Sequence, residues 1–149
     1  YYGVAIGRGS DGKFNRSLLS FDTSQLPVGA EIVSARLTLN WRSAYGDPWA
    51  SPAGNRLLID LRNGCFGGAC SLLASDHGAA TSVDAVAEVP RFTAGSQDSG
   101  NFSTAALAAI NRSGRTQLRL RFASSQASTA YVWVGSSTQA TLKIEYRLP

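Results

Sequence analysis

Residues 32–41 read Ile-Val-Ser-Ala-Arg-Leu-Thr-Leu-Asn-Trp, and apolar and polar residues alternate along this stretch. A period of two is typical of a strand with one face in a hydrophobic core. The stretch therefore predicts a half-buried antiparallel strand. The alternation places Val33, Ala35, Leu37, Leu39 and Trp41 on the core side and Ile32, Ser34, Arg36, Thr38 and Asn40 on the outer side.

Other stretches follow the same pattern. Residues 117–122 place Leu118, Leu120 and Phe122 inward, and residues 141–148 place Leu142, Ile144, Tyr146 and Leu148 inward. Shorter strand candidates, separated by clusters of Gly, Ser, Pro and Asn, are Leu18 to Asp22, Arg56 to Arg62, Val86 to Val89 and Ala130 to Val134. Many short strands with turns between them indicate a sandwich rather than a helical fold.

Helix is scarce in this sequence. Ser103 is expected to cap a short helix that stops near Gly114, and Ser71 to His77 is expected to form one turn. The fold class predicted from these elements is all-β: an antiparallel β-sandwich (jelly roll) with one or two short helical connections.

The chain of 149 residues suits a single domain over 1–149, with 44% apolar and 16% charged residues. No stretch approaches the roughly 20 apolar residues of a membrane-spanning helix, so no membrane span is expected. The amino terminus lacks a basic stretch followed by an apolar one, so any signal peptide is expected to have been removed already.

The two cysteines, Cys65 and Cys70, lie in Asn-Gly-Cys-Phe-Gly-Gly-Ala-Cys, where small and flexible residues make a tight loop closure feasible. A disulfide is predicted there. The alternative is half a zinc site, but there is no second cysteine pair and His77 is the only histidine. A disulfide indicates an oxidising compartment, so the protein is expected to be secreted or extracellular.

No set of catalytic residues stands out. His77 is adjacent to Asp76, but sequence neighbours rarely form a nucleophile-activating relay. Glycoside hydrolysis by an unrecognised pair of carboxylates stays an alternative. No cofactor is expected, although a stabilising calcium ion is compatible with the oxygens of Asp22, Asp47, Asp60 and Asp76.

Exposed aromatic rings are the usual platforms of sugar-binding modules. Tyr45 and Trp49 lie in the loop after the first strand described above, whereas Trp41 fits the inward phase of that strand. Tyr45 and Trp49 are therefore candidate sugar platforms, and the alternative is that they pack as a lid on the core.

Net charge is +4, with twelve arginines and two lysines. The simplest explanation for the excess of arginine over lysine is a bacterial genome that favours arginine codons. If the strands share a sheet, the outward side chains of Arg36, Arg119, Arg121, Lys143 and Arg147 form a basic stripe suited to an acidic polysaccharide. The alternative is a solvated face balanced by Glu145 and Asp60. Nucleic acid is not an expected partner, because the aromatic residues are not interleaved with this stripe.

Residues 15–39, Asn-Arg-Ser-Leu-Leu-Ser-Phe-Asp-Thr-Ser-Gln-Leu-Pro-Val-Gly-Ala-Glu-Ile-Val-Ser-Ala-Arg-Leu-Thr-Leu, resemble the signature of disaggregatase-related repeat (DNRLRE-type) domains. That signature runs Arg-x-Leu-Leu-x-Phe-Asp-x-Ser-x-Leu-Pro and then Ala-x-Ile-x-Ser-Ala-x-Leu. Residues 58–67, 73–76, 108–122 and 140–146 resemble a branch of such modules in secreted bacterial proteins.

The resemblance implies a jelly-roll module attached to extracellular enzymes and surface proteins, some relatives of which bind polysaccharide, including alginate. It supplies no catalytic residues. The expected function is therefore a non-catalytic extracellular module that binds or anchors to polysaccharide or a cell-surface glycan.

These modules usually begin one strand earlier than this chain, in which only Tyr1 to Phe14 precede the matched strand. A missing first strand would expose an edge that a neighbouring chain can fill by strand addition. The alternative function is therefore a self-assembling subunit of an extracellular fibre or surface layer, with other copies of itself as partners.

Overall fold

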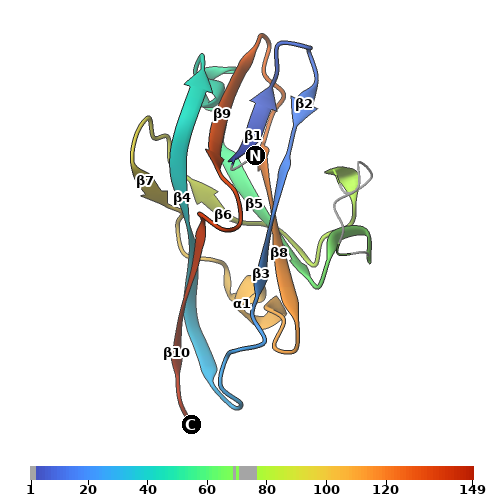
Figure 1. Ribbon diagram of the computed structural model, residues 1–149, viewed down its shortest axis with the longest axis vertical. Helices are drawn as coiled ribbons and strands as arrows, with labels where there is room; N and C mark the ends of the chain where they lie inside the picture. Colours follow the sequence, from blue (N-terminus) through green and yellow to red (C-terminus); the bar gives the residue numbers. More distant parts are fainter. Residues whose placement is uncertain (1–2, 69, 71–76) are drawn as a thin grey trace.

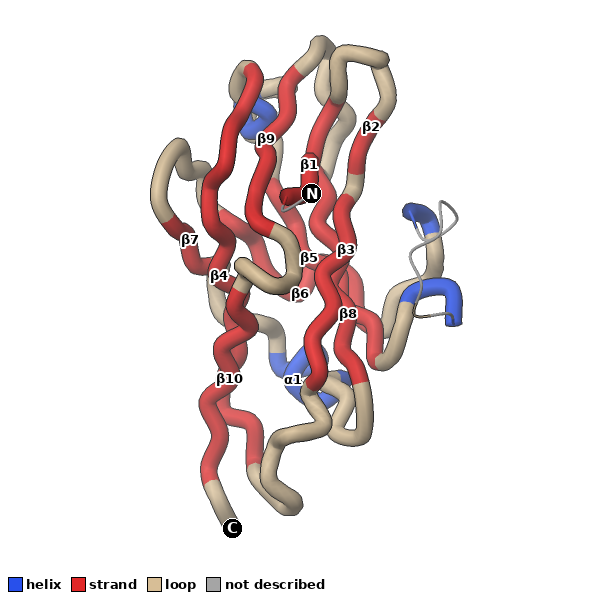
Figure 2. Tube along the Cα trace, in the orientation of Figure 1, coloured by secondary structure: helices blue, strands red, loops and turns tan. Residues whose placement is uncertain are grey.

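The computed structural model describes residues 3–68, 70 and 77–149, and it is an antiparallel β-sandwich with few short helices (Figures 1 and 2). The predicted fold class is confirmed. The strands are β1 (Gly3–Arg8), β2 (Phe14–Asn15), β3 (Ser17–Asp22), β4 (Glu31–Tyr45), β5 (Leu57–Asn63), β6 (Val83–Val89), β7 (Ser96–Asp98), β8 (Arg115–Phe122), β9 (Ala130–Gly135) and β10 (Thr141–Arg147). The helices are α1 (Thr104–Ala109) and the 3-10 turns η1 (Pro48–Ala50) and η2 (Phe66–Gly68).

Two sheets make up the sandwich. The first sheet has the order β10-β4-β9-β1-β2, with β7 also paired to β4, and the second sheet has the order β3-β8-β5-β6. The long strand β4 connects the first sheet along its length: its first half pairs with β10 and its second half with β9. Figure 1 shows β10 beside the lower part of β4 and β9 beside the upper part.

Most residues of β4 are buried or exposed as the alternation in the sequence predicts. Ala35, Leu37 and Leu39 are buried in the core, as expected, and Trp41 packs against the core while half-buried. The expectation for the start of the strand is wrong: Val33 is exposed and Ile32 packs against the core. The cause is a register shift, because Glu145 lies opposite Ser34 but Tyr146 lies opposite Ile32, which makes Val33 an extra residue on β4.

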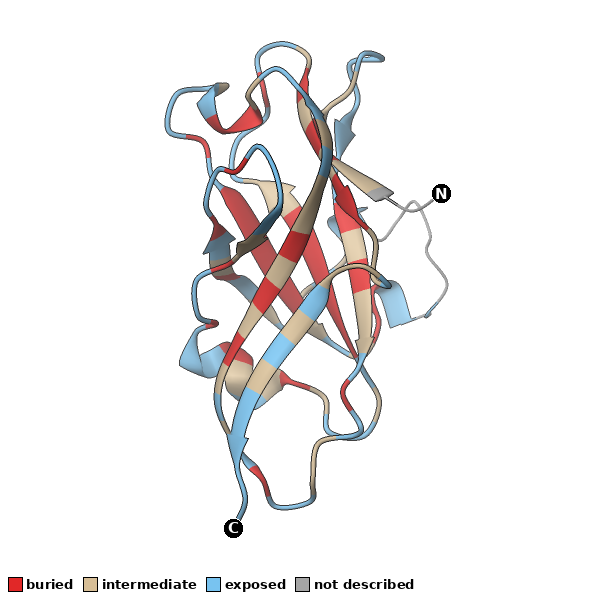
Figure 3. Cartoon of the chain, turned by 60° about the vertical axis from the view of Figure 1, so that its left-hand side comes forward, coloured by how far each residue is buried: buried red, intermediate tan, exposed pale blue. Residues whose placement is uncertain are grey.

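The centre of the core lies between the two sheets (Figure 3). On β8, Leu118 and Leu120 are fully buried as the alternation predicted. On β5, Leu57, Ile59 and Leu61 are also fully buried, but so is Asp60 between them. Strand β5 is therefore covered on both faces.

The predicted cap of α1 is confirmed, because the Ser103 side chain accepts a hydrogen bond from the N–H of Ala106. The other expected helical turn, Ser71 to His77, lies outside the described residues except for His77.

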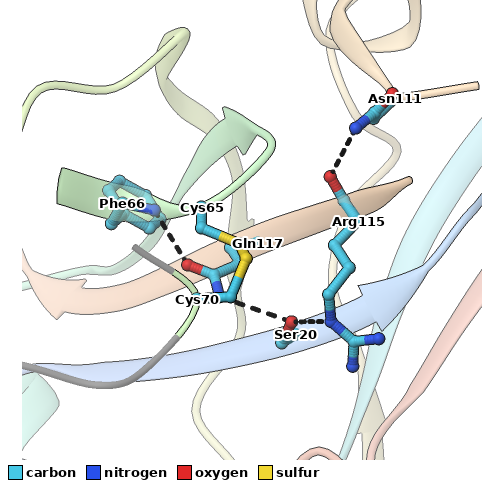
Figure 4. The surroundings of a disulfide bond; sticks show 7 residues. All are labelled: Ser20, Cys65, Phe66, Cys70, Asn111, Arg115 and Gln117. Carbon is cyan, nitrogen blue, oxygen red and sulfur yellow. Dashed lines mark hydrogen bonds between the residues drawn. A yellow bond between two sulfur atoms is a disulfide. The ribbon is translucent and has the colours of Figure 1, made fainter. Parts of the chain in front are cut away.

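Cys65 and Cys70 form the predicted disulfide, with their Cα atoms 5.2 Å apart (Figure 4). The segment holding Cys65 is fixed on the outer face of the second sheet. The N–H of Phe66 donates to the Gln117 side-chain oxygen at 2.9 Å, and the Phe66 ring lies 4.9 Å from the Arg119 guanidinium carbon. This segment therefore covers the outward-facing side chains of Gln117 and Arg119 on β8.

Removing the disulfide is expected to lower the free energy of unfolding by about 2 kcal/mol, because the bond closes a short loop. Urea denaturation of the Cys65→Ala, Cys70→Ala double variant would measure the loss. Wild-type protein in reducing agent should match the variant. Equal stability of the oxidised and reduced proteins would contradict the prediction.

Candidate functional site

Tyr45 lies at the end of β4 with 59% of its surface exposed. Its ring stacks on that of Tyr131, with ring centroids 6.1 Å apart and an interplanar angle of 15°. The two residues are direct cross-strand neighbours on β4 and β9. Of the two alternatives for Tyr45, the structure shows the exposed one: its ring reaches the solvent and has a second ring beside it.

Strand β9 presents a third aromatic ring on the same face. Val132 and Val134 are fully buried and point into the core, so Tyr131 and Trp133, which alternate with them, point to the outer side. Both are half-buried. We call Tyr45, Tyr131 and Trp133 the aromatic face.

Small residues border the aromatic face on β1. Trp133 lies opposite Ala5, and Tyr131 lies opposite Gly7. These short neighbours leave a shallow hollow of about 260 Å³ beside the two β9 rings. It is lined by Ala5, Gly9, Ser10, Asp11, Asn15, Tyr131 and Trp133.

Glycine is required at Gly7. Its φ of +120° is rare for residues with a side chain, and a Cβ there would lie 2.5 Å from the carbonyl oxygen of Ala130 and 3.0 Å from Cα of Tyr131. The absence of a side chain at this position therefore permits the close approach of β1 to β9 beside the aromatic face.

Polar groups lie at the far side of the hollow. The Asn15 side-chain amide donates to the carbonyl of Gly7 at 3.4 Å, and the Asp11 carboxylate accepts from the N–H of Lys13 at 3.0 Å. Rings on one side and polar groups on the other form an amphipathic surface, which is the arrangement that suits a sugar with an apolar ring face and polar hydroxyls.

The expectation of an exposed platform at Trp49 is wrong. Its ring is buried and packs edge-on against Phe92 and Phe122, with centroid distances of 6.1 and 5.4 Å. The indole N–H donates to the carbonyl of Val89 at 3.2 Å. Asp47 accepts a hydrogen bond from the Trp49 N–H and caps η1.

The expectation of a single basic stripe is also wrong. Arg36 and Arg147 lie in the first sheet, on β4 and β10, whereas Arg119 and Arg121 lie on β8 in the second sheet. The outer faces of the two sheets point in opposite directions (Figure 1). The structure therefore does not bring these four arginines together.

Three basic residues of the first sheet, Arg36, Lys143 and Arg147, lie among acidic ones. This matches the alternative of a balanced, solvated face. The ion pairs are Arg36 with Asp98 at 4.0 Å and with Glu145 at 3.9 Å, Lys143 with Asp98 at 3.4 Å and Arg147 with Glu31 at 3.1 Å.

In the second sheet, Arg119 and Arg121 both bind the carboxylate of Asp60. Their guanidinium groups donate four hydrogen bonds to it at 2.8 to 3.1 Å, and the N–H of Ala85 donates a fifth at 2.9 Å. Burial raises the pKa of the Asp60 carboxyl, but the hydrogen bonds from Arg121, Ala85 and Arg119 outweigh it and hold the pKa below its ordinary value. This cluster is a buried structural ion pair rather than a ligand surface.

His77 lies beside basic groups. The Arg16 guanidinium donates to its backbone carbonyl at 2.9 Å. Burial and the positive charges of Arg16 and Arg119 lower the pKa of the His77 imidazole. Asp76, which precedes His77 in the sequence, lies outside the described residues.

Three of the acidic residues considered for calcium already have partners. Asp22 accepts from Ser24, Asp47 from Trp49 and Arg91, and Asp60 from its two arginines. Within residues 3–68, 70 and 77–149, no group of three or more His, Cys, Asp or Glu side chains is placed to hold a metal ion. A stabilising calcium ion stays a prediction.

Sequence reasoning missed Tyr131 and Trp133. The segment Ala130 to Val134 was identified as a strand, and its alternation of Val132 and Val134 with aromatic residues carried the signal for two outward rings.

Among the helices of the described residues, none is long and apolar enough to cross a membrane. The sequence matches no protein-family model and has no significant match among curated proteins. The resemblance to disaggregatase-related repeat domains therefore stays a prediction.

Proposed function

We propose that this protein is a non-catalytic extracellular module that binds polysaccharide by stacking sugar rings on its aromatic face. The observation that carries the proposal is the set of three outward aromatic rings on neighbouring strands, Tyr45, Tyr131 and Trp133, beside a hollow with polar groups. Aromatic clusters that are partly exposed to solvent are candidate binding surfaces.

The rigidity of the surface supports this function. Tyr131 and Trp133 are held on a strand that is hydrogen-bonded on both sides, by β4 and by β1. Rings on a paired strand lose little conformational freedom on binding, so more of the stacking energy contributes to affinity.

The charge of the hollow favours a neutral polysaccharide over an acidic one. The only ionisable side chain among the residues that line the hollow, apart from the tyrosine, is Asp11. The arginines Arg36 and Arg147, expected to attract an acidic chain, belong to ion pairs on the part of the first sheet formed with β10. Binding is therefore expected to depend weakly on salt.

The disulfide supports an extracellular location, because such bonds persist in oxidising compartments. An extracellular location is compatible with polysaccharide binding, but the disulfide is not itself evidence for that binding.

Replacing Tyr131 and Trp133 together by alanine is expected to weaken polysaccharide binding about thirtyfold, at roughly 1 kcal/mol for each ring. Affinity electrophoresis against neutral and acidic polysaccharides would identify a ligand, and isothermal titration with soluble oligosaccharides would measure the loss. Tyr45→Ala is expected to give a smaller loss.

The matched control is Tyr146→Ala, which removes an exposed tyrosine of the same sheet that lies on β10, away from the aromatic face. It should bind a short soluble oligosaccharide, which reaches a single aromatic face, like the wild type. Failure of the folded wild type to bind any polysaccharide, or equal binding by the double variant, would overturn the proposed function.

A further inference from the structure

Strand β10 forms an open edge of the first sheet. It pairs with β4, and the described residues contain no strand on its other side. By contrast, β9 is flanked by β4 and β1. One side of β10 therefore offers a row of backbone N–H and C=O groups to another strand.

Apolar side chains of β10 are partly exposed. Val132 and Val134 on β9 are fully buried, but Leu142 and Ile144, which face the core from β10, are only half-buried, and Tyr146 is 44% exposed. Figure 3 shows β10 as largely exposed beside the buried positions of β4.

A lateral groove of about 300 Å³ lies between this edge and the second sheet. Leu142, Ile144 and Tyr146 line one side, and Phe21 and Leu26 line the other. Apolar residues at every second position of an open strand favour an occupant that is itself an extended polypeptide, because only a strand matches both the backbone groups and the spacing of two.

The sequence of β10, Thr-Leu-Lys-Ile-Glu-Tyr-Arg over Thr141–Arg147, is complementary to itself when two copies run antiparallel. With Ile144 opposite Ile144 of the second copy, Lys143 lies opposite Glu145 on the outer face. Leu142 then lies opposite Tyr146 on the inner face. Opposite charges and aliphatic–aromatic pairs directly across an antiparallel ladder are both favourable.

Neighbouring registers are unfavourable. A shift of one residue puts inward side chains opposite outward ones. A shift of two in one direction puts Lys143 opposite Lys143, and in the other direction it puts Glu145 opposite Glu145 and Lys143 opposite Arg147. The register centred on Ile144 is therefore selected by charge.

Two common protections against such pairing, a bulged residue and a proline, are absent from β10. The extra residue of the β10–β4 register shift, Val33, belongs to β4, so β10 has no bulged residue, and it contains no proline. The present ion pairs of Lys143 and Glu145 are exposed and long, at 3.4 and 3.9 Å, so little free energy opposes an exchange of partners.

We infer that two copies of this chain associate edge to edge through β10, antiparallel and centred on Ile144. The pairing is isologous and closes at two copies, and it joins the two first sheets into one continuous sheet. The apolar residues of each lateral groove gain a neighbour from the other copy.

A consequence for binding rests on the proposed function. Opposed residues of an antiparallel pair lie on the same face, so both aromatic faces of the dimer point to the same side of the continuous sheet. A long polysaccharide that reaches both would bind with increased avidity. The dimer itself is tested without any ligand.

Sedimentation velocity from about 1 µM to about 1 mM would measure the association, and a concentration-dependent monomer–dimer equilibrium is expected. Lys143→Glu and Glu145→Lys, each alone, put like charges opposite each other twice in the dimer. Each is expected to raise the dissociation constant tenfold or more. An equimolar mixture of the two variants should restore a dimer that contains one copy of each.

Glu88→Lys, an exposed charge reversal on β6 in the second sheet, is the matched control and should dimerise like the wild type. Circular dichroism would verify that all variants fold. A monomer throughout the concentration range, growth beyond a dimer, dimers insensitive to both variants, or a mixture that stays monomeric would each overturn the inference. Polysaccharide binding by the monomeric variants would leave the proposed function intact.

Discussion

Replacing Asp60 by alanine is expected to lower the free energy of unfolding by about 3–5 kcal/mol. The carboxylate is fully buried and accepts five hydrogen bonds, four of them from Arg119 and Arg121. The Arg119 side chain is only 6% exposed, so the variant would leave a buried guanidinium without its counter-charge. An unpaired buried charge is far more destabilising than the loss of a surface ion pair.

Urea denaturation would measure this loss. Glu88→Ala is the matched control, because it removes the acid of an exposed ion pair with Arg56 from the same sheet. It should change stability by less than about 1 kcal/mol. A loss at Asp60→Ala as small as that of the control would contradict a structural role for the cluster.

The pH dependence gives an independent readout of the same cluster. The folded-state pKa of Asp60 lies below its ordinary value, so its contribution to stability is present above the unfolded-state pKa and is lost as the pH falls through the folded-state pKa. The stability difference between wild type and Asp60→Ala should therefore be constant near neutral pH. It should shrink as the pH falls below about 4.

The alternation in the sequence predicts which side chains of a strand face the core. It does not predict which other residues cover the opposite face of that strand. Leu118 and Leu120 face the core as predicted, because side-chain direction in a strand follows directly from position. Arg119 alternates with them and was expected in solvent. Its burial depends on Phe66 and Asp60, which are distant in sequence and meet β8 only in the fold.

The aromatic residues show the same limit. The direction of a loop side chain such as Trp49 has no period to fix it, and its ring turned inward. The direction of Trp133 was fixed by its place between Val132 and Val134, so the sequence contained the information for the better candidate.

The open edge of β10 could not be predicted from its own residues. The stretch alternates as regularly as β4 does, and alternation says nothing about how many neighbours a strand has. Pairing on the second side is a non-local property, which appears only when the sheet order is known.

Replacing Trp49 by alanine is expected to lower the free energy of unfolding by about 3–5 kcal/mol while leaving polysaccharide binding by the folded protein unchanged. The change removes the edge contacts with Phe92 and Phe122 and leaves a cavity between them. It also deprives the buried carbonyl of Val89 of the indole N–H that donates to it. A ring that packs in the core contributes to stability, whereas a ring that forms a platform contributes to affinity.

Two further variants separate these roles. Trp49→Phe keeps part of the ring packing but loses the hydrogen bond, so its loss of stability should be smaller than that of alanine. Tyr45→Ala, at an exposed position, should change stability by less than about 0.5 kcal/mol. Thermal or urea unfolding gives the stability of each variant, and titration with the polysaccharide gives its affinity. A Trp49→Ala protein that is as stable as the wild type but has lost binding would contradict the assignment of this ring to the core rather than to the binding surface.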